Sequence, residues 1–290
     1  MINLTAQYIS RKERKEKAAQ RIHKTKYYFT LILLLCLLTT NFSFSQRQAP
    51  KTELLIIGTI HNGNKHFNHK TLYNNIKKYN PDIILWEQSD VFEPVFGLRT
   101  ASFLKIWKPG IEQLALQKYS RINKNCKILP FDTAIASRKK YLQQMEKTGE
   151  AFFDRLNNSN MSPADSIVYA DYANKRNNFY EFIVDTSLQR INKADIIEIS
   201  GNLYHLEEKY ILPLGKKYIA DTLLLKQFED ELKFWIARNN YMVKQIKNYA
   251  TQYPGKRIII LTGLNHKYYL QEKLLEQKES AIKMIELESE

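Results

Sequence analysis

Two histidines in this sequence follow apolar runs in the same way, although they lie near opposite ends of the chain. The run at residues 54–57 leads into a Gly-x-x-His segment that ends at His61, and the run at residues 258–261 leads into one that ends at His266. An unbroken apolar run closed by glycine is typical of a buried strand. In parallel α/β sheets, ligands bind at the carboxyl ends of the strands. The two segments therefore predict a pair of imidazoles in one site.

A carboxylate is expected at the same edge of the sheet. The apolar run at residues 83–86 ends on Glu87, and residues 71–79 before it have the apolar spacing of a helix. A strand, a helix and a second strand in this order form a βαβ unit with a right-handed crossover. We therefore expect Glu87 near His61, on a neighbouring strand. Asp132 closes a third, shorter apolar segment and is a further acid of this kind.

Two kinds of chemistry are open to these side chains. His61, Glu87 and His266 could ligate a divalent metal, Zn or Mn, that keeps an open position for water. Without a metal, the same groups could act as general base and general acid in ester or amide hydrolysis. Arg238, on a predicted late helix, would hold a substrate carboxylate or stabilise an oxyanion. The spacing alone does not choose between them, but no HExxH, CxxC, phosphate-loop or GxSxG motif occurs in the sequence.

The elements that must position these residues predict an α/β fold with some α+β character. Strand and helix patterns at both ends indicate a central, mostly parallel sheet of about four to six strands with flanking helices. The middle, from about residue 133 to about residue 250, has helical patterning and few glycines, which predicts a large helical insertion. Ser162 and Asp221 are predicted helix starts there. Residues 46–290 are therefore expected to form one domain.

The net charge of +14 does not predict nucleic-acid binding. Residues 11–26 hold eight basic and two acidic residues, so this segment accounts for +6, and the remaining +8 is spread along the chain. Such a distribution favours solubility over a nucleic-acid interface.

The N-terminal segment predicts export. The apolar run at residues 27–38 follows the basic segment; it is shorter than the roughly 20 residues of a membrane span and suits a signal-peptide core. Ser43 and Ser45 are the small residues before a cut at Gln46. Residues 1–45 are thus a predicted signal peptide, or an N-terminal anchor if they are not cleaved. The protein is expected to be periplasmic or anchored facing outside the cytoplasm, with membrane contact through this segment alone.

Taken together, the motifs resemble those of the TraB/PrgY/GumN family. The chain carries GTIH at residues 58–61, Glu87 after the second strand, ARNNYM at residues 237–242 and GLNH at residues 263–266, within residues 53–288. The wider superfamily includes the Tiki proteases, erythromycin esterase and the ChaN-like haem-binding proteins. The chain departs from the family pattern in three residues: His66, His69 and Asn265.

The resemblance implies a hydrolase with four active-site residues: His61, Glu87, Arg238 and His266. Asn239 and Tyr268 are two further candidates for that set. The leading hypothesis is an exported hydrolase that acts on a peptide or a small-molecule ester. The alternative is a non-catalytic protein that sequesters a peptide or haem, for which the pair Tyr204-His205 would supply the haem ligand; otherwise this pair would lie in a surface loop.

Overall fold

The computed structural model describes residues 50–90, 92, 109–276 and 281–288. The predicted signal peptide or anchor at residues 1–45, with its cut before Gln46, lies outside the described residues. Among the helices of the described part, none is both long enough and apolar enough to cross a bilayer.

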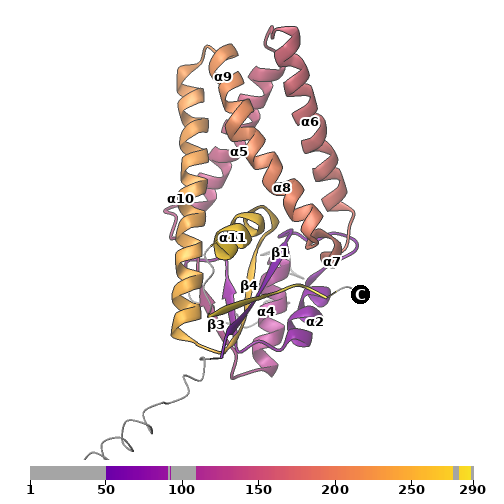
Figure 1. Cartoon of the computed structure of the whole chain (residues 1–290), viewed down its shortest axis with the longest axis vertical. Coiled ribbons are helices and arrows are strands. Elements are labelled where there is room, and N and C mark those ends of the chain that lie inside the picture. The colour runs from indigo at the N-terminus through magenta and orange to yellow at the C-terminus, as the bar shows by residue number, and fades with distance from the viewer. Residues whose placement is uncertain (1–49, 91, 93–108, 277–280, 289–290) are drawn as a thin grey trace, which may run out of the picture. The chain divides into compact units, whose positions relative to one another are not determined.

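The sheet has five strands, and all of its neighbouring strands are parallel. They are β1 (Thr52–Thr59), β2 (Ile83–Trp86), β3 (Lys127–Pro130), β4 (Arg257–Gly263) and β5 (Ile282–Ile285), in the order β3-β2-β4-β1-β5 (Figure 1). The predicted parallel α/β sheet is confirmed. The prediction that Glu87 follows a strand next to that of His61 is wrong, because β4 pairs with both β1 and β2 and separates them.

The register of β1 and β4 brings the two glycine segments to the same level. Gly58 pairs with Thr262, and Thr59 pairs with Gly263, so the two Gly-x-x-His segments leave the sheet side by side. The apolar residues of both strands are almost fully buried, as expected for strands covered on both faces. The polar residues at the ends of both strands therefore lie at one edge of the sheet. The buried apolar residues before them hold the strands in place.

Three helices accompany the sheet in Figure 1: α2 (His69–Tyr79), α4 (Ile111–Ile122) and α11 (Leu264–Glu276). α2 packs against α4, whereas α11 packs on β1 and β4. α11 begins at Leu264, immediately after β4. His266 therefore lies in the first turn of a helix, where its backbone position is well defined.

The helical insertion predicted at about 133–250 is confirmed. It comprises α5 (Arg138–Asn157), α6 (Pro163–Val184), α7 (Leu188–Ile191), α8 (Ala194–Leu206), the π-helical η1 (Glu207–Ile211), α9 (Leu212–Tyr218) and α10 (Thr222–Gln252). The side chains of Ser162 and Asp221 cap α6 and α10, as their positions in the sequence predict. Residues 196–203, whose pattern fits a strand or a helix, are helical.

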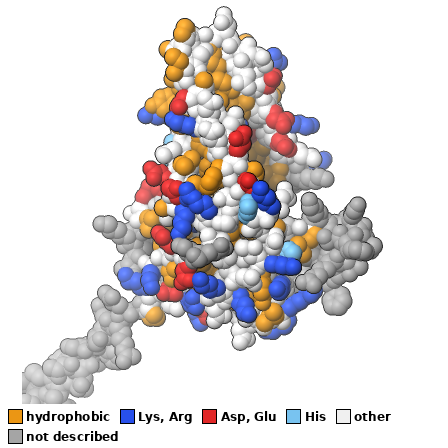
Figure 2. Space-filling view, turned by 90° about the vertical axis from the view of Figure 1, so that its right-hand side faces the viewer, with side chains coloured by type: hydrophobic (Ala, Val, Ile, Leu, Met, Phe, Trp, Pro, Cys, Tyr) orange, Lys and Arg blue, Asp and Glu red, His pale blue; other side chains and the backbone are white. Residues whose placement is uncertain are grey.

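α10 belongs to both halves of this domain, since Figure 1 shows it running from the insertion down past the sheet. In the insertion, the ring of Phe228 stacks on that of Phe152 in α5, with ring centroids 3.7 Å apart. On the face drawn in Figure 2, hydrophobic side chains gather over the insertion, while charged side chains gather lower, over the sheet. α10 thus carries side chains from the aromatic interior of the insertion to the polar edge of the sheet.

Candidate functional site

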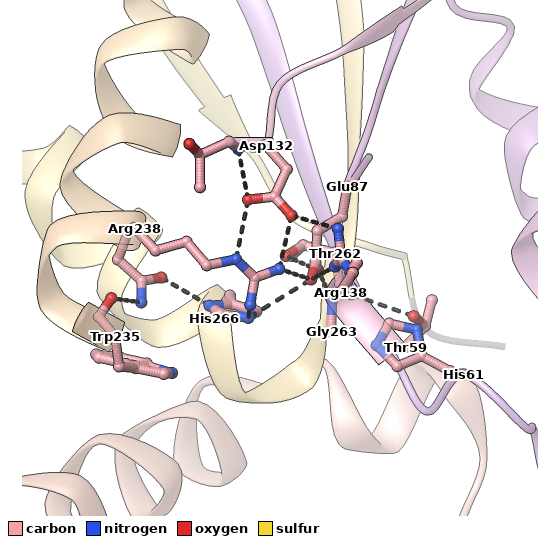
Figure 3. A network of polar contacts seen from close by, with 12 residues as sticks. Thr59, His61, Glu87, Asp132, Arg138, Trp235, Arg238, Thr262, Gly263 and His266 are labelled. Atoms are coloured by element: carbon pink, nitrogen blue, oxygen red, sulfur yellow. Dashed lines mark hydrogen bonds and ion pairs between the residues drawn. The ribbon is translucent and has the colours of Figure 1, made fainter. Parts of the chain in front are cut away.

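The predicted site residues come together at the carboxyl edge of the sheet (Figure 3). His61 follows β1, Glu87 follows β2 and Asp132 lies just beyond β3. His266 reaches the same place from the first turn of α11, and Arg238 reaches it from α10. Three strand ends and two helices therefore supply one cluster.

Glu87 is buried and fully engaged. Its Oε2 accepts hydrogen bonds from the Thr262 hydroxyl (2.8 Å) and the Gly263 N–H (2.6 Å), and its Oε1 accepts one from Nη2 of Arg238 (2.7 Å). Burial alone would raise the pKa of Glu87, but its electrostatic interactions with His266 and Arg238 and the hydrogen bond from the Gly263 N–H outweigh burial and lower this pKa to about 2. Glu87 is therefore a fixed negative charge at neutral pH.

Arg238 joins the two buried acids. Its Nε and Nη2 donate to the two carboxylate oxygens of Asp132 at 2.9 and 2.7 Å, and Nη2 also reaches Glu87. Nη1 lies 3.2 Å from Nε2 of His266, and the side chain is only 10% exposed. The guanidinium points inward and pairs with Glu87. With every nitrogen engaged, it is a positioning group and is not free to hold a substrate carboxylate.

Arg138 is the arginine that faces solvent in this cluster. It is the first residue of α5; its Nη1 donates to Asp132 at 2.9 Å, and its Nη2 lies 3.8 Å from Oε1 of Glu87. The side chain is 28% exposed, so part of the guanidinium can meet a bound molecule. The sequence analysis missed Arg138, and its position shortly after Asp132 is the only local signal that could have indicated it.

Hydrogen bonds determine the tautomer of His266. The amide nitrogen of Asn239 donates to the Trp235 carbonyl at 2.7 Å, which turns the amide oxygen toward Nδ1 of His266 at 2.8 Å. Nδ1 therefore carries the proton, and Nε2 presents its lone pair to Arg238. Burial lowers the pKa of His266, and its ring stacks on that of Trp235 with centroids 5.7 Å apart. His266 is a neutral, enclosed imidazole.

His61 has the opposite character, because its side chain is 64% exposed. Its Nδ1 lies 2.8 Å from Oε1 of Glu112, the second residue of α4, and the Thr59 hydroxyl donates to the same oxygen. This hydrogen bond raises the pKa of His61 above its ordinary value of 6.5. Glu112 is buried and has no predicted role in the sequence analysis. It holds the proton on Nδ1 and leaves Nε2 as the free basic nitrogen.

The three predicted ligands meet around Gly263. A Cβ atom added to Gly263 would lie 3.3 Å from Nε2 of His61, 3.6 Å from Oε2 of Glu87 and 3.6 Å from Cδ2 of His266. Only glycine leaves this close approach open, because any side chain would enter the space between the three groups. The Gly-x-x-His segment of β4 therefore contributes its glycine as well as its histidine.

A cavity of about 260 Å³ opens beside this cluster. Its walls include His61, Glu87, Arg138, Thr262 and Glu112. His266 and Arg238 do not line it, so the exposed imidazole, the exposed guanidinium and the buried carboxylate are the groups that meet a ligand. Such a concave space with a few convergent polar groups can hold a small ligand.

A metal bound by His61, Glu87 and His266 does not fit this arrangement. In the described part of the chain, no group of three or more His, Cys, Asp or Glu side chains is placed to hold an ion. Both oxygens of Glu87 already accept hydrogen bonds, and Nε2 of His266 faces a guanidinium, which would repel a cation. Dependence on Zn or Mn stays a prediction, and metal analysis of the purified protein tests it.

Among the described residues, the other histidines, His66, His69 and His205, lie elsewhere. His66 pairs with Asp185 at 2.8 Å on the surface, and His69 is the first residue of α2. Tyr204 and His205 lie in α8, so the surface-loop interpretation of this pair is wrong. His205 is exposed, whereas the Tyr204 ring stacks on that of Trp235 with centroids 4.2 Å apart.

Asn239 and Tyr268, the two further candidates for the predicted set, lie close to His266. Asn239 contacts the His266 ring directly through its amide oxygen, as described above. Tyr268 reaches it only through Trp235, against which its ring stacks with centroids 5.9 Å apart. No protein-family model, curated protein or solved structure matches the chain.

Proposed function

We propose that this protein is an exported hydrolase of the TraB/GumN-like kind, which cleaves a peptide or ester bond in the cavity beside His61. The single observation that carries the proposal is the hydrogen bond between Nδ1 of His61 and buried Glu112, which leaves Nε2 free at the cavity. A carboxylate on one ring nitrogen and open space at the other is the arrangement of a general base.

His61 removes a proton from the attacking water. Glu112 holds the ring in the required tautomer and stabilises the imidazolium that forms, and Glu87 adds a second negative charge nearby that favours the protonated ring. The imidazolium then gives its proton to the leaving amine or alkoxide, which closes the proton balance. General acid–base catalysis of this kind contributes roughly 10²–10⁴-fold to the rate.

Arg138 stabilises the negative charge that develops on the carbonyl oxygen. Its guanidinium lines the cavity, and Asp132 anchors one of its nitrogens while the side chain stays partly exposed. A preorganised donor of this kind contributes roughly 10²–10³-fold. Arg238 acts one step further away, since it holds Glu87 and Asp132 in place beneath the reacting groups.

Turnover of chromogenic esters and fluorogenic peptides tests the proposal. His61→Gln should lower kcat/KM by about 10²–10⁴-fold and leave the unfolding temperature nearly unchanged, because the ring is exposed. His66→Gln, which removes another surface histidine paired with a carboxylate, is the matched control and should retain activity. Hydrolysis that is equal in both variants would refute the role of His61. Assays with and without a chelator show whether Zn or Mn takes part.

A second candidate function is a non-catalytic binder of a peptide. It is favoured by one observation: His266 is enclosed by Asn239 and Arg238, so His61 alone presents a free imidazole nitrogen to the cavity. Saturable peptide binding without turnover would support this second function. A Soret band in the purified protein would indicate that the bound molecule is haem.

A further inference from the structure

A second cavity, of about 200 Å³, lies inside the helical insertion and is separate from the proposed reaction site. Helices α5, α6, α8 and α10 enclose it above α11. Its polar lining comprises Ser200, Tyr204, Glu207, Glu231, Asn265 and Tyr268. Tyr180 also lines it and is 40% exposed, so the cavity reaches the surface. The proposed hydrolase uses none of these residues.

Two carboxyl groups line this cavity, those of Glu207 and Glu231. Glu207, the first residue of η1, accepts a hydrogen bond from the Tyr172 hydroxyl, and Glu231 shares one with Thr148. Within the described part of the chain, no lysine, arginine or histidine lines the cavity. Burial raises the pKa of Glu207 and raises that of Glu231 to about 7. Desolvation is the largest cause in both groups, and at Glu207 it outweighs the charge of Arg176.

Two phenol hydroxyls in the same lining have no hydrogen-bond partner among the residues that the structure describes. Tyr268 is only 5% exposed, and its hydroxyl is buried and unpaired. The hydroxyl of Tyr204 is likewise buried and unpaired. Buried polar groups in folded proteins are almost always hydrogen-bonded, so two unpaired hydroxyls in one cavity indicate a missing partner. Glu207 also begins a π-helical segment, and such segments are frequent at functional sites.

We propose that this cavity binds an alkylammonium group, either of a small amine or of a lysine-like side chain. An ammonium group has three N–H donors and no acceptor, which suits the carboxylates of Glu207 and Glu231 and the oxygens of Tyr204 and Tyr268. The apolar side chains of Phe228 and Leu232 line the same cavity and would contact the alkyl stem. An anionic ligand does not suit this cavity, because its described lining holds two acidic side chains and no basic one.

Binding should release protons near neutral pH. An ammonium group favours the ionised form of Glu231, so a carboxyl group that is partly protonated at pH 7 loses its proton when the ligand enters. The groups that act on this region come from each surrounding helix: Tyr141 on α5, Arg176 on α6, Tyr204 and Glu207 on α8 and η1, and Tyr268 on α11. The tyrosine hydroxyls stay protonated at this pH because burial raises their pKa values.

Calorimetric titration of the full chain with n-butylammonium chloride at pH 7 tests the proposal, in two buffers of different ionisation enthalpy. We expect saturable binding with proton release, and no binding of n-butanol, the neutral probe of similar size. Glu231→Gln should weaken binding at least about tenfold, the effect of losing one charge-assisted hydrogen bond, and abolish the proton release. The matched control is Glu229→Gln, on the same helix but in surface pairs with Lys216 and Lys233, which should bind normally.

Three results would overturn the proposal: no saturable heat with n-butylammonium, equal affinity in Glu231→Gln, or equal binding of n-butanol. Thermal unfolding checks that each variant is folded. If Glu231→Gln does not fold, Tyr268→Phe takes its place, since it keeps the ring and removes only the unpaired hydroxyl. We expect it to weaken n-butylammonium binding severalfold, and unchanged binding in that variant would count against the site.

Discussion

Replacing Arg238 with methionine removes the guanidinium that joins α10 to the ends of β2 and β3. The variant keeps an unbranched side chain of good helix propensity, so α10 itself should persist. It leaves the carboxylates of Glu87 and Asp132 buried without their main partner. Removing one partner of a buried ion pair lowers the free energy of unfolding by about 3–5 kcal/mol. Arg138 still contacts Asp132, so we expect the lower part of that range.

The pH at which acid unfolds the protein should also change in Arg238→Met. The pKa of Glu87 is about 2 in the folded protein against an ordinary value of 4.5, so its stabilising contribution is present above pH 4.5 and is lost as the pH falls toward 2. Without Arg238, one of the charges that lower this pKa is gone, and the pKa of Glu87 rises. Acid unfolding of Arg238→Met should therefore begin at a higher pH than that of the parent protein.

Urea unfolding at pH 7 measures the first effect, and the midpoint of acid unfolding measures the second. Arg190→Met is the matched control, because Arg190 also forms two hydrogen bonds with one carboxylate, that of Asp195, at 2.7 Å each, but is 42% exposed. An exposed pair contributes about 0–1 kcal/mol. If the two variants lose equal stability, or if the acid midpoint does not move, the network around Arg238 does not exist as described.

Further predictions concern the exposed base, the glycine and the N-terminus. Glu112→Gln should lower the pKa of His61, so the rising limb of the pH–rate profile and the NMR titration of its ring both move to lower pH; an unmoved titration would contradict the hydrogen bond. Gly263→Ala should lower kcat/KM at least about tenfold and lower the free energy of unfolding by about 1–3 kcal/mol through overpacking. Gly149→Ala is the control: its Cβ would meet no atom within 4 Å, and it should stabilise helix α5 by about 0.5–1 kcal/mol. N-terminal sequencing of protein from the native host should begin near Gln46, and a soluble cytoplasmic product with an intact N-terminus would refute export.

The sequence was sufficient to predict the residues whose placement depends on local pattern. His61, Glu87 and Asp132 each follow an apolar run, and parallel strands share one carboxyl edge, so their convergence needs no knowledge of strand order. Strand order itself is non-local: nothing near β2 indicates that β4, from the far end of the chain, pairs between β1 and β2. The prediction that Glu87 follows a strand next to that of His61 was therefore wrong, although both residues lie at the predicted edge of the sheet.

The residues that the sequence analysis missed reach the site from helices. Glu112 and Arg138 stand in the first turns of α4 and α5, and which way such a side chain points depends on how the helix packs against the sheet. Asn239 is a related case. The ARNNYM motif includes it, but its role as the hydrogen-bond acceptor for His266 depends on the helical turn in which its amide nitrogen donates to the Trp235 carbonyl. Periodicity predicts that a helix exists, but only tertiary packing determines which side chains reach the strand ends.

α10 connects the two cavities through residues one turn apart. Arg238 is tied to the acids at the sheet edge, while Trp235 stacks on His266 and on Tyr204, whose hydroxyl faces the cavity of the insertion. A ligand bound between Glu207 and Glu231 would therefore press first on Trp235 and through it on His266. His61 is held instead by Glu112 on α4. In the proposed hydrolase, the enclosed imidazole of His266 would therefore respond to the insertion, and the exposed imidazole of His61 would meet the substrate.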